Sequence, residues 1–174
     1  YKYNLALPFD LEMHYAKVTR GQQSYWIDTT GKDYLLAESI EAISPKTEVV
    51  DLSKKGLTQF PVEVFRCNKL KILVLAKNAL EEIPAAIEKL TKLEQLDLEG
   101  NKITDLPPSL GNLASLKILN LSRNKIFELP ASFGNLTNLI ELELSASGLK
   151  TLPESFGNLS HLKKLNYQWN QLEI

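Results

Sequence analysis

Apolar and polar residues alternate in short stretches that recur along most of the chain, and residues 96–99 show the pattern clearly. Leu96 and Leu98 alternate there with the acids Asp97 and Glu99. Alternation of this kind predicts a short β-strand with one apolar face and one polar face. Because four residues cannot form a stable structure alone, other segments must cover the two leucines.

The alternating stretch returns every 23 residues, together with the residues that follow it. The column after each strand contains Lys55, Asn78, Asn101, Asn124, Ser147 and Asn170. A proline column contains Pro61, Pro84, Pro107, Pro130 and Pro153. A fixed period of this length predicts a solenoid, in which stacked coils bury a core that no single coil could bury.

The pattern LxxLxLxxNxLxxLPxxIxxLxxL resembles the leucine-rich repeat family in its 23-residue form. The resemblance covers residues 47–174 as five repeats and a truncated sixth. It implies an α/β fold: a right-handed solenoid with a curved parallel sheet inside and irregular, 3-10 or short helical segments on the convex side. It also implies a protein partner rather than a small molecule.

The asparagine column has a physical explanation. An asparagine side chain carries two donor hydrogens and an acceptor oxygen, so it can satisfy backbone groups in its own coil and in a neighbouring coil. The column therefore predicts a ladder of hydrogen bonds inside the solenoid. Ser147 can supply part of this bonding, whereas Lys55 has no acceptor and suits the first coil.

Residues 1–46 do not follow the repeat. The segments "YAKVTRG" and "SYWID" predict two strands, and "DTTGKDY" predicts a turn. The segment "LLAESIEAIS" predicts a short amphipathic helix, with Leu36, Ile40 and Ile43 at helical spacing. A hairpin and a helix together predict a small α+β cap over the open core of the first coil.

Within this segment, residues 15–37 are similar to a single WG-type β-repeat, a unit of roughly VxxGxxxWxIDxxGK. The signature Trp-Gly pair is absent, and Tyr25 and Trp26 stand nearby instead. The similarity implies that further β-repeats lie upstream. The alternative is an irregular hairpin and helix that serve only as a cap.

The polar side of each strand is predicted to form the inner face of the solenoid. This face mixes charged residues with exposed apolar residues and a tryptophan, a mixture that favours protein binding. The candidate contacts are Ile72, Val74, Lys77, Asp97, Glu99, Ile118, Asn120, Arg123, Glu141, Glu143, Asn166, Gln168 and Trp169. The alternative is a passive face that is polar only for solubility.

Charge and composition exclude several other classes of function. The 20 basic and 21 acidic residues give a net charge of −1, which argues against a general nucleic-acid binder. No apolar run is long enough to span a membrane. A single cysteine, Cys67, allows no internal disulfide, so we expect a reducing compartment, with the cytoplasm as the default.

The sequence predicts no catalytic, cofactor-binding or metal-binding residue. His14 and His161 have no cysteine or acidic partner at metal-ligand spacing. Cys67 stands in a leucine column and is predicted to be a core residue without a nearby base. The predicted function is therefore non-enzymatic recognition of a protein partner.

The alternative function is a non-catalytic regulatory or scaffolding arm of a larger enzyme or signalling protein. The chain starts without a methionine, so we expect a piece of a longer protein or a processed chain. Leu172 and Ile174 remain in repeat register at its end. An uncapped last coil of this kind predicts a surface that could self-associate.

Overall fold

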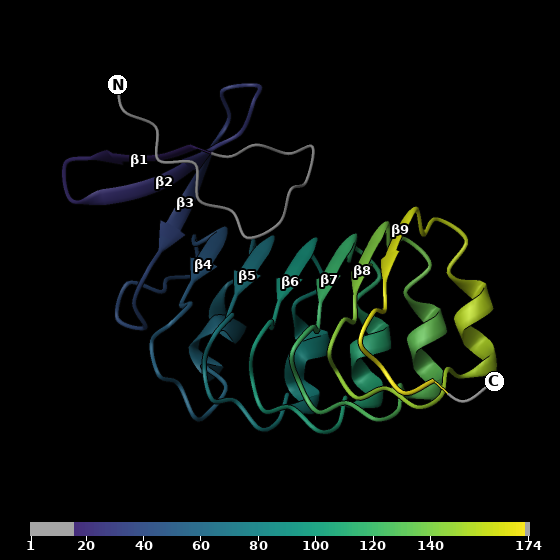
Figure 1. Ribbon diagram of the computed structural model, residues 1–174. Helices are drawn as coiled ribbons and strands as arrows, with labels where there is room; N and C mark the ends of the chain where they lie inside the picture. The colour runs from purple at the N-terminus through teal and green to yellow at the C-terminus, as the bar shows by residue number, and fades with distance from the viewer. Residues whose placement is uncertain (1–15, 173–174) are drawn as a thin grey trace.

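The strands of the computed structural model, which describes residues 16–172, form one sheet whose order follows the sequence (Figure 1). The strands are β1 Ala16–Arg20, β2 Gln23–Ile27, β3 Asp33–Ala37, β4 Val49–Asp51, β5 Ile72–Val74, β6 Gln95–Asp97, β7 Ile118–Asn120, β8 Glu141–Glu143 and β9 Lys164–Asn166. The pairs β1–β2 and β2–β3 are antiparallel, and every pair from β3 to β9 is parallel.

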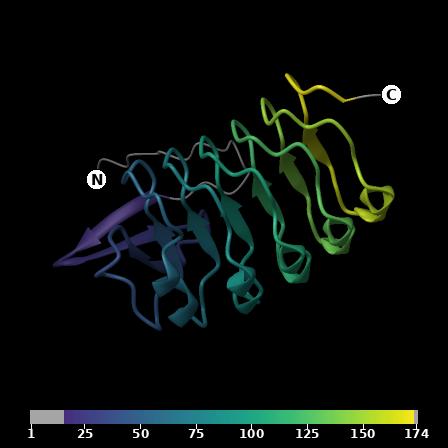
Figure 2. The same ribbon diagram turned by 90° about the horizontal axis from the view of Figure 1, so that it is seen from below.

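Each strand from β4 to β8 lies on one side of the solenoid, and a short helix follows it on the other side (Figures 1 and 2). These are 3-10 helices: η1 Val62–Arg66, η2 Ala85–Lys89, η3 Pro108–Asn112, η4 Ala131–Asn135 and η5 Glu154–Asn158. Each one starts directly after a proline of the repeat column, whose fixed φ and missing N–H suit this position. The predicted leucine-rich-repeat solenoid is confirmed, with a convex side of 3-10 helices.

The leucines of the strands are buried between successive coils, as the repeat requires. Leu96 and Leu98 are fully buried in one continuous apolar cluster that runs from Ala37 to Leu159. The coils on either side of β6 therefore cover the two leucines of residues 96–99. Burial of apolar surface is the main favourable contribution to folding. In a solenoid this burial takes place between neighbouring coils, because each coil contacts only the coils next to it.

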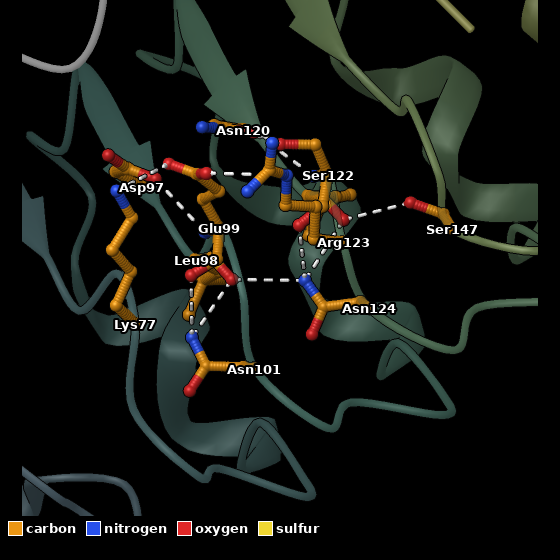
Figure 3. A network of polar contacts seen from close by, with 11 residues as sticks. Lys77, Asp97, Leu98, Glu99, Asn101, Asn120, Ser122, Arg123, Asn124 and Ser147 are labelled. Atoms are coloured by element: carbon orange, nitrogen blue, oxygen red, sulfur yellow. Dashed lines mark hydrogen bonds and ion pairs between the residues drawn. The ribbon is translucent and has the colours of Figure 1, made fainter. Parts of the chain in front are cut away.

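The asparagine ladder is present, and Figure 3 shows its central part. Asn101 Nδ2 donates to the Leu98 oxygen of its own coil at 2.9 Å and to the Leu75 oxygen of the preceding coil at 3.0 Å. Its Oδ1 accepts from the backbone N–H of Leu80 at 3.1 Å. Ser147 keeps one of these bonds, because its hydroxyl donates to the Leu121 oxygen at 3.0 Å. The partial substitution predicted for this serine is thus confirmed.

The helix predicted from "LLAESIEAIS" is wrong. Leu36 and Ala37 lie in β3, where they pair with Val49 and Val50 and extend the solenoid sheet by one strand. The residues after β3 form turns and bends, and Ile43 packs partly buried against the main core. Strand pairing satisfies the backbone of residues 36–37 while still burying the apolar side chains. The part of the predicted cap before residue 16, including His14, lies outside the described residues.

Candidate functional site

Equivalent residues of successive strands lie side by side on the inner face, because the parallel strands pair in steps of 23 residues. Asp97 pairs in register with Val74 on one side and Asn120 on the other. Asn120 in turn pairs with Glu143, and Glu143 with Asn166. Each such row crosses the sheet at a spacing of about 4.8 Å between strands. The sheet therefore brings the predicted contact residues together into ordered rows.

Two apolar residues predicted to face outward are buried. Ile72 and Val74 belong to a second apolar cluster, separate from the main core, which also contains Trp26 and Tyr34 from the hairpin strands β2 and β3. The hairpin aromatics therefore pack with the inner-face residues of the first coils. Ile72 and Val74 contribute to the attachment of the hairpin and are not available as partner contacts.

Four further predicted contacts are also buried. Asp97 is only 1% exposed, and Ile118, Asn120 and Glu141 are likewise buried. Each lies in a central strand between side chains of both neighbouring strands, which leaves little of its surface open. The prediction that these residues are accessible on the inner face is therefore wrong.

The remaining predicted contacts reach solvent. Glu99, Glu143 and Asn166 are half-buried. Lys77, Arg123, Gln168 and Trp169 are exposed, and Trp169 is 85% exposed. The accessible part of the inner face is thus much smaller than the predicted set, and its most exposed members follow the ends of the strands.

The most exposed residues share one unusual backbone conformation. They occupy the position three residues after each strand, and every residue in this column has a positive φ of 53–65°. The column contains Lys54, Lys77, Gly100, Arg123, Ala146 and Trp169, which we call the left-handed row. Five of its six residues are not glycine, although this conformation costs about 1–2 kcal/mol for a residue with a Cβ.

The left-handed row is held rigidly to the sheet. The backbone N–H of Lys77 donates to the Glu99 oxygen of the next coil at 2.6 Å. The N–H of Arg123 donates in the same way to the Ser145 oxygen at 2.9 Å. The same bond repeats from Lys54 to Ala146, so the side chains of these coils project from backbone positions that are fixed to the next coil.

The acidic side chains of the inner face are less exposed to solvent than the cationic side chains beside them. Glu99 contacts Lys77, with 4.0 Å between Oε2 and Nζ, and Arg123, with 3.8 Å between Oε1 and Nε (Figure 3). The Glu99 side chain is 14% exposed, against 47% for Lys77 and 71% for Arg123. Glu141 is similarly sunken beside Lys164, at 2.8 Å. Glu99 therefore faces cations of its own chain.

Asp97, the other acid of residues 96–99, forms no ion pair within residues 16–172. Its Oδ1 accepts from the Glu99 N–H at 3.0 Å, while its Oδ2 is buried without a hydrogen-bond partner. Burial raises the pKa of Asp97 from 3.8 to about 6, and the negative charges of Glu99 and Asp51 add to the increase. Burial also raises the pKa of Glu143. The charged form of Asp97 is thus unfavourable in the folded protein.

We expect Asp97→Asn to stabilise the protein at pH 8 by about 1–2 kcal/mol. A raised pKa means that the folded state binds the Asp97 proton more tightly than the unfolded chain. The wild type therefore loses stability as the pH rises from about 4 through about 6, and the advantage of the asparagine variant appears over that range. Asn120 already shows that an amide fits this row, since its Oδ1 accepts from the Ser122 N–H at 3.0 Å. Urea unfolding of both proteins at low and high pH measures the difference.

The exposed loop residue Asp105 provides the matched control for this substitution. Asp105→Asn removes the same charge outside the sheet, and we expect it to change the free energy of unfolding by less than about 0.5 kcal/mol at either pH. A stability gain from Asp97→Asn that is the same at low and high pH would contradict the assignment to the Asp97 proton.

The part of the chain that the structure describes contains no group of three or more His, Cys, Asp or Glu side chains able to hold a metal ion. Cys67 is buried, and burial raises its thiol pKa to about 11. Its Sγ donates to the Ser44 oxygen at 3.2 Å, as expected of a core residue. Within residues 16–172, no helix is long and apolar enough to cross a membrane.

An apolar hollow of about 610 Å³ opens at the last coil. Its lining includes Leu144, Leu152, Phe156, Leu165, Tyr167 and Trp169. Several of these side chains are exposed, because β9 is the edge strand of the sheet that residues 16–172 form. Most of this lining, including Leu144, Leu165 and Tyr167, comes from the core-facing columns of the repeat, and the hollow meets the left-handed row at Trp169.

Comparison with protein families identifies the repeats as leucine-rich repeats. A family model described as leucine rich repeat matches residues 45–103 and 114–172, and a model of two leucine-rich repeat copies matches residues 91–132. No curated protein matches the sequence. Since the matches begin at residue 45, the similarity of residues 15–37 to a WG repeat stays a prediction.

Several solved structures are similar in fold and sequence. A leucine-rich repeat protein of Leptospira interrogans is 35% identical with a TM-score of 0.73, over 78% of this chain and 34% of that one. The leucine-rich repeat ectodomain of the Arabidopsis thaliana membrane receptor kinase GASSHO1/SCHENGEN3, in complex with CASPARIAN STRIP INTEGRITY FACTOR 2, is 34% identical (TM-score 0.66, 74% of this chain and 16% of that one). The plant peptide hormone receptor RGFR1 in complex with RGF2 is 30% identical (TM-score 0.65, 85% and 25%). The chain thus spans about a third or less of each of these proteins.

Proposed function

The chain belongs to the leucine-rich repeat family, and on this basis we propose that it is a non-catalytic module that binds a protein partner on its inner face. The observation that carries the proposal is the left-handed row. It projects two lysines, an arginine and a tryptophan that is 85% exposed from a rigid sheet. Arginine and tryptophan are among the residues that contribute most to protein interfaces.

The comparisons support a protein or peptide partner. Two of the similar structures are complexes, one with CASPARIAN STRIP INTEGRITY FACTOR 2 and one with RGF2. A sheet whose strands and turns are fixed by hydrogen bonds loses little conformational entropy when a partner binds. The accessible contacts in this proposal are Lys77, Glu99, Arg123, Glu143, Asn166, Gln168 and Trp169.

Affinity capture from a lysate of the source organism, followed by mass spectrometry, tests this proposal. The variant Trp169→Ser with Arg123→Ser removes two exposed anchors of the inner face. The control Val62→Ser removes an apolar side chain that is 58% exposed on the convex helix η1. We expect a partner that is retained by the wild type and the control and lost by the double variant.

Two other results of the capture contradict the proposal. Equal capture by all three proteins would move the binding site off the inner face. Failure of the folded wild type to retain any protein would argue against recognition by this chain alone. Thermal unfolding of each variant checks that it remains folded, and none of the three substitutions removes a buried side chain.

A second proposal is that the module is a regulatory or scaffolding arm of a larger protein. The observation in its favour is that the chain spans 16% of the receptor-kinase ectodomain and 34% of the Leptospira protein that it resembles. Sequencing of the complete gene tests it, because a catalytic domain elsewhere in the protein would show its own motifs. A gene that encodes repeats alone would contradict it.

A third proposal concerns self-association through the last coil. Leu165, Tyr167 and Trp169 are exposed beside the apolar hollow at β9. Sedimentation equilibrium of the wild type and of Tyr167→Ser tests this proposal. A monomeric wild type over the whole range of concentrations would contradict it.

A further inference from the structure

The left-handed row keeps long side chains where glycine would remove backbone strain. Gly100 shows that glycine is compatible with this column, at φ 65°. The other positions nevertheless hold Lys54, Lys77 and Arg123, with Ala146 and Trp169 after them. Strained positions that persist are often functional, and the inference runs from the observed strain to the function. The side chains of the left-handed row are therefore candidate ligand-binding groups.

The row contains no acid, and its cations project above the acids of the sheet. Lys54 has no acidic partner among residues 16–172. Lys77 and Arg123 share the sunken Glu99 at distances of 4.0 and 3.8 Å, which is one carboxylate for two cations. A molecule that approaches this edge of the inner face meets positive charge first.

Arg123 is oriented for recognition of a carboxylate. The closest approach of its guanidinium to Glu99 is 3.8 Å, from Nε to Oε1, and the Arg123 side chain is 71% exposed. A guanidinium held at one nitrogen can present its terminal nitrogens as a fork to a second carboxylate. The fixed backbone of the row adds to this orientation, since the Arg123 N–H donates to Ser145 at 2.9 Å.

The spacing of the row limits the shape of the ligand. Lys77, Arg123 and Trp169 are each separated by two coils. Two strand spacings correspond to about 9.6 Å. One turn of a polyproline II helix advances about 9.3 Å over three residues and returns the side chain to the same side. A β-strand matches less well, because residues three apart in a strand point to opposite sides.

We infer that the left-handed row binds an extended acidic segment of the protein partner, with carboxylates on Lys77 and Arg123 and an apolar side chain on Trp169. The inference rests on the proposed function and specifies the chemistry of the partner. The segment has the pattern acid-x-x-acid-x-x-apolar in a polyproline II conformation. It crosses the coils along the row, above the sunken carboxylate of Glu99.

Fluorescence anisotropy with a labelled peptide of sequence Glu-Pro-Ser-Glu-Pro-Ser-Leu tests the inference on the whole chain. We expect binding that weakens as salt increases, and about tenfold weaker binding when glutamine replaces both glutamates. We expect Lys77→Glu with Arg123→Glu to weaken binding at least about tenfold. Trp169→Ala should weaken binding of this peptide but not of one that ends in serine.

The control exchange is Lys92→Glu with Lys163→Glu, which changes the net charge equally but lies at exposed positions outside the row. We expect it to change affinity less than about twofold. Equal loss in both exchanges, or equal binding of the glutamine peptide, would overturn the inference. Tighter binding of an oligothymidylate would do so as well, because it would assign the row to phosphate.

Failure of this inference is distinguishable from failure of the proposed function. If the acidic peptide does not bind but Trp169→Ser with Arg123→Ser still abolishes capture of a partner, the inner face binds a protein of other chemistry. If capture fails as well, the proposed function is wrong. Melting midpoints equal to that of the wild type show that the charge exchanges leave the fold intact.

Discussion

Replacing Asn101 with alanine is expected to lower the free energy of unfolding by about 2–4 kcal/mol. The four hydrogen bonds of the Asn101 side chain are lost, and their effects differ. The Leu75 and Leu98 oxygens each keep a second amide donor, from Asn78 and Asn124. The N–H of Leu80 loses its acceptor, because it donates to Asn101 Oδ1 at 3.1 Å and both residues are buried. Urea unfolding measures the loss.

Two further substitutions separate the ladder from a general effect of losing an amide. Asn112→Ala removes an exposed asparagine whose Nδ2 donates to Glu88, and we expect a change below about 0.5 kcal/mol. Asn101→Ser should be intermediate, because a hydroxyl can repeat the bond that Ser147 makes to the preceding coil. If Asn101→Ala were as mild as Asn112→Ala, the ladder would not stabilise the solenoid.

Replacing Gly134 with alanine is expected to cost about 3 kcal/mol. A Cβ at this position would lie 2.1 Å from the backbone oxygen and 2.7 Å from the carbonyl carbon of Ser155 in the next coil. The close atoms include backbone, so a side-chain rotation cannot relieve the clash, and the helices η4 and η5 must move apart. The glycine is required here for close approach, because its φ is not in the left-handed region. Thermal or urea unfolding measures the cost.

Gly157 is the matched control, since it holds the same repeat position one coil later. A Cβ there would meet no atom within 4 Å. We expect Gly157→Ala to be neutral or to stabilise by up to about 1 kcal/mol, because alanine restricts the unfolded chain. Similar losses in both variants would show that backbone conformation, and not the contact between coils, explains the two glycines.

The features of the fold that depend on one coil and its copies could be predicted from the sequence. The columns of leucine, asparagine and proline each repeat one local environment, so the period alone placed strands, ladder and the start of each convex segment. Ser147 was also predictable, because a hydroxyl has donor capacity but lacks the geometry of an amide. These predictions needed only nearest-neighbour contacts.

The exposure of the inner face could not be predicted in this way, because it depends on contacts outside the repeat. Ile72 and Val74 are buried with Trp26 and Tyr34, which belong to strands of the hairpin and to no column. The helix predicted for residues 35–44 failed for a related reason. The edge of β4 offers backbone partners to Leu36 and Ala37, and spacing of apolar residues does not reveal an available strand edge.

The signal for the left-handed row was present in the sequence but was incomplete. Gly100 stands in the same column as Lys54, Lys77 and Arg123. One glycine among six residues does not establish a positive φ, and Lys54 was absent from the predicted contacts. The heights of the side chains also required the structure, which shows the Glu99 carboxylate below the cations that flank it.

The asparagine ladder has a consequence for how such a protein can change over generations. Each ladder residue bonds only to its own coil and the coil before it. A duplication of 23 residues would therefore reproduce a complete set of partners and lengthen the inner face by one strand spacing, about 4.8 Å. An insertion of another length would break the ladder. The distance between Arg123 and Trp169 can therefore change during evolution only by whole coils, in steps of one strand spacing.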